Sequence, residues 1–178
     1  MKKLLRKISS YLSSFTSHLS SRKGFTLIEL LIVVAIISAL AIAVFVALDP
    51  AKRLKDANDA RRAADADTVL TAIHASIVDN KGTLPTGLTT SMAETQLGTG
   101  VSGCAIATGG CASVAAACVD LSGAAVLGKY LKSMPIDILG GTTYTAAKTG
   151  YTVTVDANNI VTIKACGTQG TTNISVSR

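Results

Sequence analysis

The feature that most constrains this chain is an apolar run of nineteen residues, Leu30 to Leu48, whose only polar member is Ser38. A helix rises about 1.5 Å per residue, so the run is about 28 Å long, close to the hydrocarbon thickness of a bilayer. Such a run predicts a membrane-spanning helix. Glu29 stands at its head, where a carboxylate costs free energy in lipid and is expected to have a partner.

The residues ahead of the run form a specific pattern. Residues 22–29 read RKGFTLIE, a basic-glycine junction followed five residues later by Glu29. With the spanning helix in this register, the pattern resembles the N-terminal signature of type IV pilins and of the pseudopilins of type II secretion. The resemblance implies that a membrane-bound prepilin peptidase cuts between Gly24 and Phe25. It also implies that the same enzyme methylates the new amino group of Phe25.

Two interpretations of Glu29 stand side by side. In a filament, its buried carboxylate can pair with the terminal amine of a neighbouring Phe25 and set the axial register, because opposite charges attract strongly in an apolar setting. Alternatively, Thr26-x-x-Glu29 forms a capping box that satisfies free backbone donors at the helix start. The two roles do not exclude each other.

The distribution of charge indicates the topology. The net charge of +6 would ordinarily suggest nucleic acid or anionic membrane as a partner. However, six basic residues and no acidic residue precede Phe25, which leaves eleven of each sign in the mature chain. A basic segment ahead of a spanning helix stays in the cytoplasm, so we expect the rest of the chain to lie outside the inner membrane. A neutral mature chain gives no sign of direct nucleic-acid binding.

A second helical segment is expected to follow the span over residues 49–80. Pro50 predicts a kink or short break between Ala47 and Pro50, because proline removes a helical hydrogen bond. Charges four residues apart suggest a solvated or subunit-facing surface, at Asp49–Arg53, Lys52–Asp56, Lys55–Asp59 and Arg61–Asp65. An apolar stripe is expected to pack on a sheet and comprises Ala66, Val69, Leu70, Ile73, Ile77 and Val78.

Residues 81–178 are expected to form a small head. A loop rich in Gly, Ala, Thr and Ser comes first, and residues 120–132 are expected to form a short helix. Strands are predicted at Tyr151 to Val155 and Ile160 to Lys164, with others around Tyr144 and at Asn173 to Val176. The predicted fold is α+β: a long N-terminal helix, transmembrane and then amphipathic, packed on a small antiparallel sheet as in pilins. The expected parts are a removed leader (1–24), a filament-core helix (25–48), the amphipathic half (49–80) and the head (81–178).

All four cysteines lie in the expected head, at Cys104, Cys111, Cys118 and Cys166. An even count on the oxidising side of a membrane predicts two disulfides, with three possible connectivities. We favour Cys104–Cys111 with Cys118–Cys166, because the latter resembles the C-terminal disulfide loop of many pilins. A four-cysteine zinc site is the rival, but no C-x-x-C pair supports it. We therefore expect no metal and no cofactor.

The resemblance implies a structural protein rather than an enzyme. The only mature histidine is His74, on the long helix, so the head has no histidine to activate a nucleophile. The implied partners are other copies of the chain in a helical filament, the prepilin peptidase and methyltransferase, the inner-membrane pilus assembly machinery and, before assembly, the membrane itself. The implied location is the inner membrane first and a surface pilus afterwards. A minor pilin or type II pseudopilin is an alternative, and a single-span anchored binding protein is a distant one.

Overall fold

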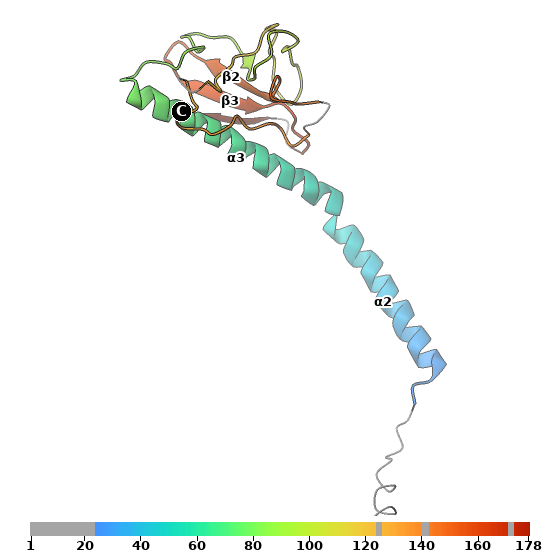
Figure 1. The fold of residues 1–178 in the computed structure, drawn as a ribbon. Helices are drawn as coiled ribbons and strands as arrows, with labels where there is room; N and C mark the ends of the chain where they lie inside the picture. The colour runs from blue at the N-terminus through green and yellow to red at the C-terminus, as the bar shows by residue number, and fades with distance from the viewer. Residues whose placement is uncertain (1–23, 124–125, 140–142, 171–172) are drawn as a thin grey trace, which may run out of the picture. The chain divides into compact units, whose positions relative to one another are not determined.

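The computed structural model describes residues 24–123, 126–139, 143–170 and 173–178, so the predicted leader, except Gly24, lies outside the described residues. The chain divides into two compact units, Met1–Leu48 and Asp49–Arg178. Figure 1 shows the described elements in chain order, α2, α3 and the strands β1 to β4. Each unit is described by itself.

The described part of the first unit contains helix α2, which runs from Leu27 to Leu48. None of its 22 residues is buried. Its single polar side chain within the apolar run, Ser38, donates a hydrogen bond to the carbonyl oxygen of Val34 at 2.8 Å. This bond satisfies the hydroxyl inside the helix, so Ser38 adds little polarity to the helix surface.

The helical run is interrupted at Asp49, within the stretch where a kink or break is predicted from Pro50. Asp49 has a left-handed backbone, with φ 37° and ψ 72°, and its side chain accepts a hydrogen bond from the amide of Lys52 at 3.2 Å. Pro50 then occupies the first position of α3, where its missing N–H is not needed. Helix α3 extends from Pro50 to Asp79.

The sheet in the second unit is antiparallel and has the order β1-β2-β3-β4. Its strands are Thr95–Gln96, Tyr151–Val155, Val161–Ala165 and Ile174–Ser177. Asn159, with φ 62°, lies in the turn between β2 and β3, and the side chain of Asp156 accepts two backbone N–H bonds there. The predicted α+β class, a long helix with a small antiparallel sheet, is confirmed.

Two element predictions in the head are wrong. Among the described residues around Tyr144 there is no strand, and Tyr144 itself is buried in a loop. The strand that pairs with the outer side of β2 is instead the two-residue β1, inside the predicted loop. Among the described residues of 120–132 there are turns and no α-helix. The amides of Val126 and Gly128 both bond to the carbonyl of Gly123, which closes a tight turn in place of a helical start.

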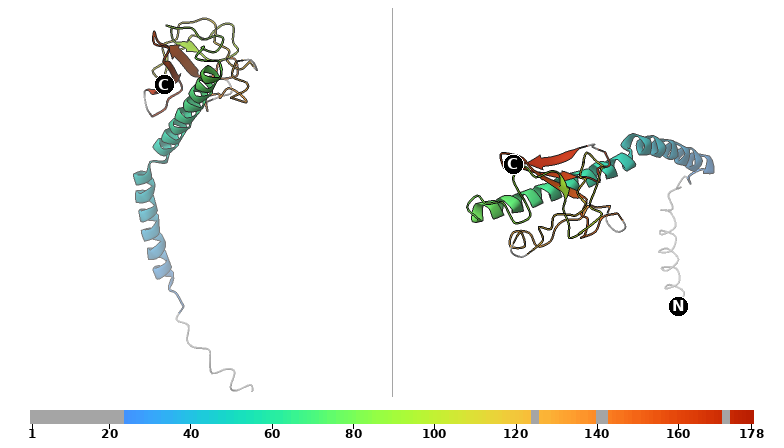
Figure 2. Two further views of the ribbon diagram at one scale, coloured as in Figure 1. Left: turned by 90° about the vertical axis from the view of Figure 1, so that its left-hand side faces the viewer. Right: turned by 90° about the horizontal axis from the view of Figure 1, so that it is seen from above.

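Helix α3 packs across one face of the sheet, against β3 and β4 (Figures 1 and 2). The residues of β2 and β3 on that face are fully buried, among them Tyr151, Val153 and Ile163. The apolar stripe of α3 supplies Ala66, Val69, Leu70 and Ile73, together with Ala72, which the pattern did not include. Val78 was expected in the stripe but is 75 % exposed, because it lies in the last turn of the helix.

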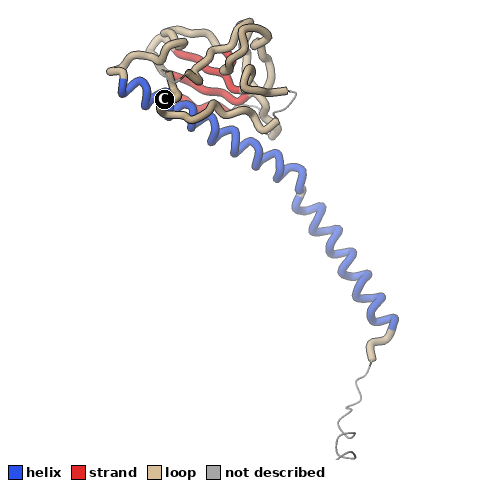
Figure 3. The backbone as a smooth tube through the Cα atoms, viewed as in Figure 1, coloured by secondary structure: helices blue, strands red, loops and turns tan. Residues whose placement is uncertain are grey.

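The loop between α3 and β2 contributes to both faces of the sheet. Figure 3 shows how much of the head consists of such loops. On the face away from α3, Glu94 accepts hydrogen bonds from Thr152 at 2.8 Å and from Lys164 at 2.8 Å. Glu94 also accepts the amide of Ala112 at 3.1 Å. This one carboxylate therefore ties the long loop to β2 and β3.

Candidate functional site

The start of α2 is the candidate site, because the predicted processing and assembly residues all fall there. The side chain of Phe25 is 84 % exposed. Thr26 caps the helix: its hydroxyl accepts the amide of Glu29 at 3.2 Å and donates to Glu29 Oε2 at 2.8 Å. The amide of Thr26 in turn donates to the same carboxylate oxygen at 2.8 Å.

These bonds form the capping box that the sequence suggests as one role of Glu29. The box uses residues from Thr26 onward, so cleavage between Gly24 and Phe25 would leave it intact. Both bonds from Thr26 go to Oε2, and Oε1 has no hydrogen-bond partner among the described residues. The geometry therefore leaves one carboxylate oxygen available to a further donor.

The rest of α2 is apolar on every side. Its large apolar side chains are between 47 and 79 % exposed, from Val33 to Leu27. Among the described residues, one helical stretch is long and apolar enough to cross a membrane, and it includes α2. A helix that is hydrophobic all round is stable when lipid or other helices surround it. The site thus combines a capped, charged start with a surface that needs an apolar environment.

A comparison with protein-family models identifies the sequence motif at the start of α2. The model of the prokaryotic N-terminal methylation motif matches residues 19–45. The chain carries this methylation motif. The motif is characteristic of type IV pilins and pseudopilins, and its presence supports the interpretation of this chain as a pilin-like or pseudopilin protein. Comparisons with curated proteins and with solved structures gave no match.

The methylation motif covers Gly24, Phe25 and Glu29, together with most of α2, but none of the head. The pilin-type interpretation of the chain therefore rests on the N-terminal region and on the α+β fold. Its implications are processing by a prepilin peptidase, membrane anchoring of the helix and assembly into a pilus-like polymer.

In the head, both disulfide pairings favoured from the sequence are wrong. The bonds join Cys104 to Cys118 and Cys111 to Cys166. The reason is a short hairpin in the loop, where Ile106 and Ser113 pair through two backbone hydrogen bonds. The hairpin brings its two ends together and leaves Cys111 near its turn, where the end of β3 lies close by. A disulfide still links the loop to the sheet, but through Cys111.

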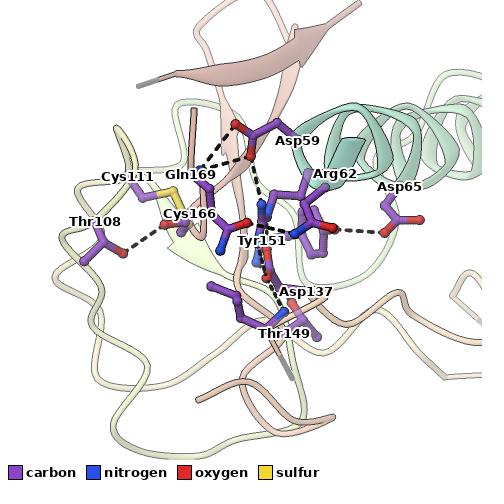
Figure 4. Close-up of polar contacts among 12 residues, drawn as sticks. Asp59, Arg62, Asp65, Thr108, Cys111, Asp137, Thr149, Tyr151, Cys166 and Gln169 are labelled. Carbon is purple, nitrogen blue, oxygen red and sulfur yellow. Dashed lines mark hydrogen bonds and ion pairs between the residues drawn. A yellow bond between two sulfur atoms is a disulfide. The ribbon is translucent and has the colours of Figure 1, made fainter. Parts of the chain in front are cut away.

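The head also contains a buried ionic cluster that sequence reasoning missed (Figure 4). Arg62 is fully buried, and its guanidinium donates to both carboxylate oxygens of Asp137, at 2.6 and 2.9 Å. A third bond goes to Asp59 at 2.8 Å. The bond with Asp137 is the main reason that the pKa of Arg62 is raised. Asp59 was expected, as a partner of Lys55, on a solvated or subunit-facing surface, and this expectation is wrong because Asp59 is buried.

The cluster joins three segments that are distant in the sequence. Asp59 accepts the amides of Gln169 and Gly170, the latter at 2.7 Å, and Asp137 accepts the amide of Leu139 at 2.8 Å. These bonds compensate part of the desolvation that buried charges suffer. The sequence contained a signal for the burial of these two residues. Arg62 and Asp59 precede Ala66 by four and seven residues, so they lie on the same face of α3 as the apolar stripe.

A neighbouring polar contact continues the same helix face. The hydroxyl of Tyr151 donates to Asp65 at 3.0 Å (Figure 4). Burial, and then the charge of Asp65, raises the pKa of Tyr151. No group of three histidine, cysteine or acidic side chains within the described parts of the chain could hold a metal ion. The polar groups of this cluster bond to one another and fix the loops at Asp137 and Gln169 against α3.

Proposed function

We propose that this chain is the structural subunit of a type IV pilus-like filament. Prepilin peptidase cleaves between Gly24 and Phe25, the new terminus is N-methylated, and the mature subunits polymerise through their N-terminal helices. The observation that carries this proposal is the methylation motif, in register with an exposed apolar helix. The parts of the subunit would be residues 25–48 as filament core and 49–178 as amphipathic helix and head.

The exposed surface of α2 supports polymerisation. Twenty-two residues with no buried side chain are compatible with a bilayer before assembly and with a helical bundle afterwards. Heterologous contacts between identical subunits that do not close into a ring produce a filament. The head would then lie at the filament surface, with its disulfides in an oxidising compartment.

The role proposed for Glu29 is to bind the terminal amine of a neighbouring subunit. Oε2 is engaged by Thr26, so the pairing would use Oε1. The capping box then holds the carboxylate in one orientation, which lowers the entropy cost of the pairing. In an apolar core, the ion pair would fix one axial register between the subunits.

The test compares two substitutions at the same site. Glu29→Gln keeps the capping box, because glutamine also serves at this position, but it removes the charge. Thr26→Val removes the cap hydroxyl and keeps the charge. We expect Glu29→Gln to reach the membrane and to be processed, but to give little sheared filament, whereas Thr26→Val has the smaller effect. Normal filament yield from Glu29→Gln would sink the proposed role of the charge.

A minor pilin or a type II pseudopilin would share the motif and the fold, and abundance in the sheared fraction separates them from a major pilin. A single-span anchored binding protein is the remaining alternative. In that case α2 would be only an anchor, and Glu29→Gln would change neither location nor assembly. The observation that favours the filament is Glu29 itself, since a plain anchor has no use for a carboxylate at the start of its span.

A further inference from the structure

The first two turns of α3 are not covered by the head. Every residue from Pro50 to Ala57 is exposed, and the first buried residue of the helix is Asp59. This exposed segment, residues 50–57, contains three cations, at Lys52, Arg53 and Lys55. None of the three forms an ion pair among the described residues, whose ion pairs are all made elsewhere.

The three cations lie on one side of the helix axis, within an arc of about 160°. Each residue turns an α-helix by about 100°, so Arg53 lies about 100° from Lys52 and Lys55 lies about 200° from Arg53. The widest gap between them holds Leu54, which is 65 % exposed. The segment therefore presents one positively charged side, which suits an anionic surface such as that of a membrane.

The position of the segment along the chain fits the same partner. Only Asp49 separates it from α2, so the cations follow Leu48 by four to seven residues. Within α3 the three cations lie two to five residues beyond Pro50, which is about 3–8 Å of helical rise. The polar headgroup layer on each side of a bilayer is about 5–8 Å thick, and lysine and arginine side chains can reach back toward it.

We propose that Lys52, Arg53 and Lys55 bind anionic phospholipid headgroups in the leaflet from which α2 emerges at Leu48. Asp56 offsets one of the positive charges, and the carboxylate of Asp49 accepts the amide of Lys52 in the helix cap. The segment keeps a net positive charge. Leu54 extends the apolar surface on the remaining side of the helix, so the segment holds the end of the span at the membrane surface.

The experiment uses the full chain in vesicles. The sequence has no tryptophan, so Leu54→Trp places one fluorophore within the segment, at an exposed position. Two vesicle preparations of the same composition are compared, each made of phosphatidylcholine with a minor fraction of phosphatidylglycerol. In the first, the phosphatidylglycerol carries brominated acyl chains. In the second, an equal fraction of the phosphatidylcholine carries them instead. Each cation near the surface strengthens anionic-lipid binding about fivefold, so we expect stronger quenching from brominated phosphatidylglycerol.

Two further variants make the test specific. Replacing Lys52, Arg53 and Lys55 together by glutamine should make the two lipids quench equally, and high salt should weaken the preference. Arg61→Gln is the matched control. Arg61 is exposed but lies eleven residues beyond Pro50, about 17 Å along α3, so the substitution should leave the preference unchanged. The triple change removes positive charge outside the membrane, so it does not favour inversion of the chain.

In the Leu54→Trp chain with its three cations intact, equal quenching by the two brominated lipids would overturn the proposal. Absence of quenching by either lipid would overturn it as well. A preference that survives the triple change would also overturn it. Equal quenching together with a filament defect in the triple variant would assign the cations to an acidic surface of a second subunit instead. The proposal needs α2 to lie in a bilayer but does not need filament assembly, so a failure of assembly alone leaves this readout intact.

Discussion

Asp137→Asn tests whether the buried ionic cluster holds the head together. The substitution conserves volume but replaces a carboxylate that accepts two bonds from Arg62, at 2.6 and 2.9 Å, by an amide that is half donor. Arg62 is fully buried and keeps only Asp59 as a charged partner. Removal of one partner from a buried ion pair costs about 3–5 kcal/mol. Because Asp59 remains, we expect a loss at the lower end, about 3 kcal/mol in the free energy of unfolding.

The assay is thermal unfolding of the oxidised full chain in detergent, followed by far-ultraviolet circular dichroism. A loss of about 3 kcal/mol corresponds to a fall of about 10 °C in the midpoint for a unit of this size. Asp79→Asn is the matched control, since it makes the same chemical change in an exposed ion pair with Lys129. Exposed pairs contribute little, so its midpoint should barely move. If both variants shift the midpoint equally, the argument from burial is refuted.

Two further predictions concern the loop and its attachment to the sheet. Mapping of disulfide-linked peptides should find Cys111 joined to Cys166, and peptides that join Cys118 to Cys166 would contradict the structure. Loss of the Cys111–Cys166 bond should cost about 4 kcal/mol in the free energy of unfolding. This is more than loss of Cys104–Cys118 should cost, because Cys111–Cys166 closes a longer loop. Burial raises the pKa of Glu94, but hydrogen bonds, chiefly from Lys164, lower it overall. The ionised Glu94 stabilises the fold above its unfolded pKa of about 4.3, and this stabilisation is lost as the pH falls through the lower pKa of the folded state. The free energy of unfolding of Glu94→Gln should therefore fall less at acidic pH than that of the unchanged chain.

The parts of the fold that depend on local sequence were predictable. Helix α2 follows from a single apolar run, and the hairpin from Tyr151 to Ala165 follows from alternation around an Asp-Ala-Asn-Asn turn. The break at Asp49 follows from the proline after it. Each of these signals lies within one segment, so no knowledge of distant partners was needed.

The parts that depend on distant partners were not predictable. β1 has only two residues, and its only partner in the sheet, β2, lies more than fifty residues away. The phase of the α3 stripe puts Arg62 on the buried face, but a charged helix residue is ordinarily expected in solvent unless it is paired. The main partner that allows its burial, Asp137, lies 75 residues away in the sequence. The cysteine pairing depended on a hairpin inside a loop that has no alternating pattern.

The measurement that tests the central claim most directly is mass spectrometry of the N-terminus in material sheared from the cell surface. The account predicts a chain that begins at N-methylated Phe25 and is recovered in that sheared fraction. This result would show processing, methylation and export in one experiment. A chain that retains the residues before Gly24 and occurs only in the membrane fraction would contradict the account, and it would make α2 a simple anchor.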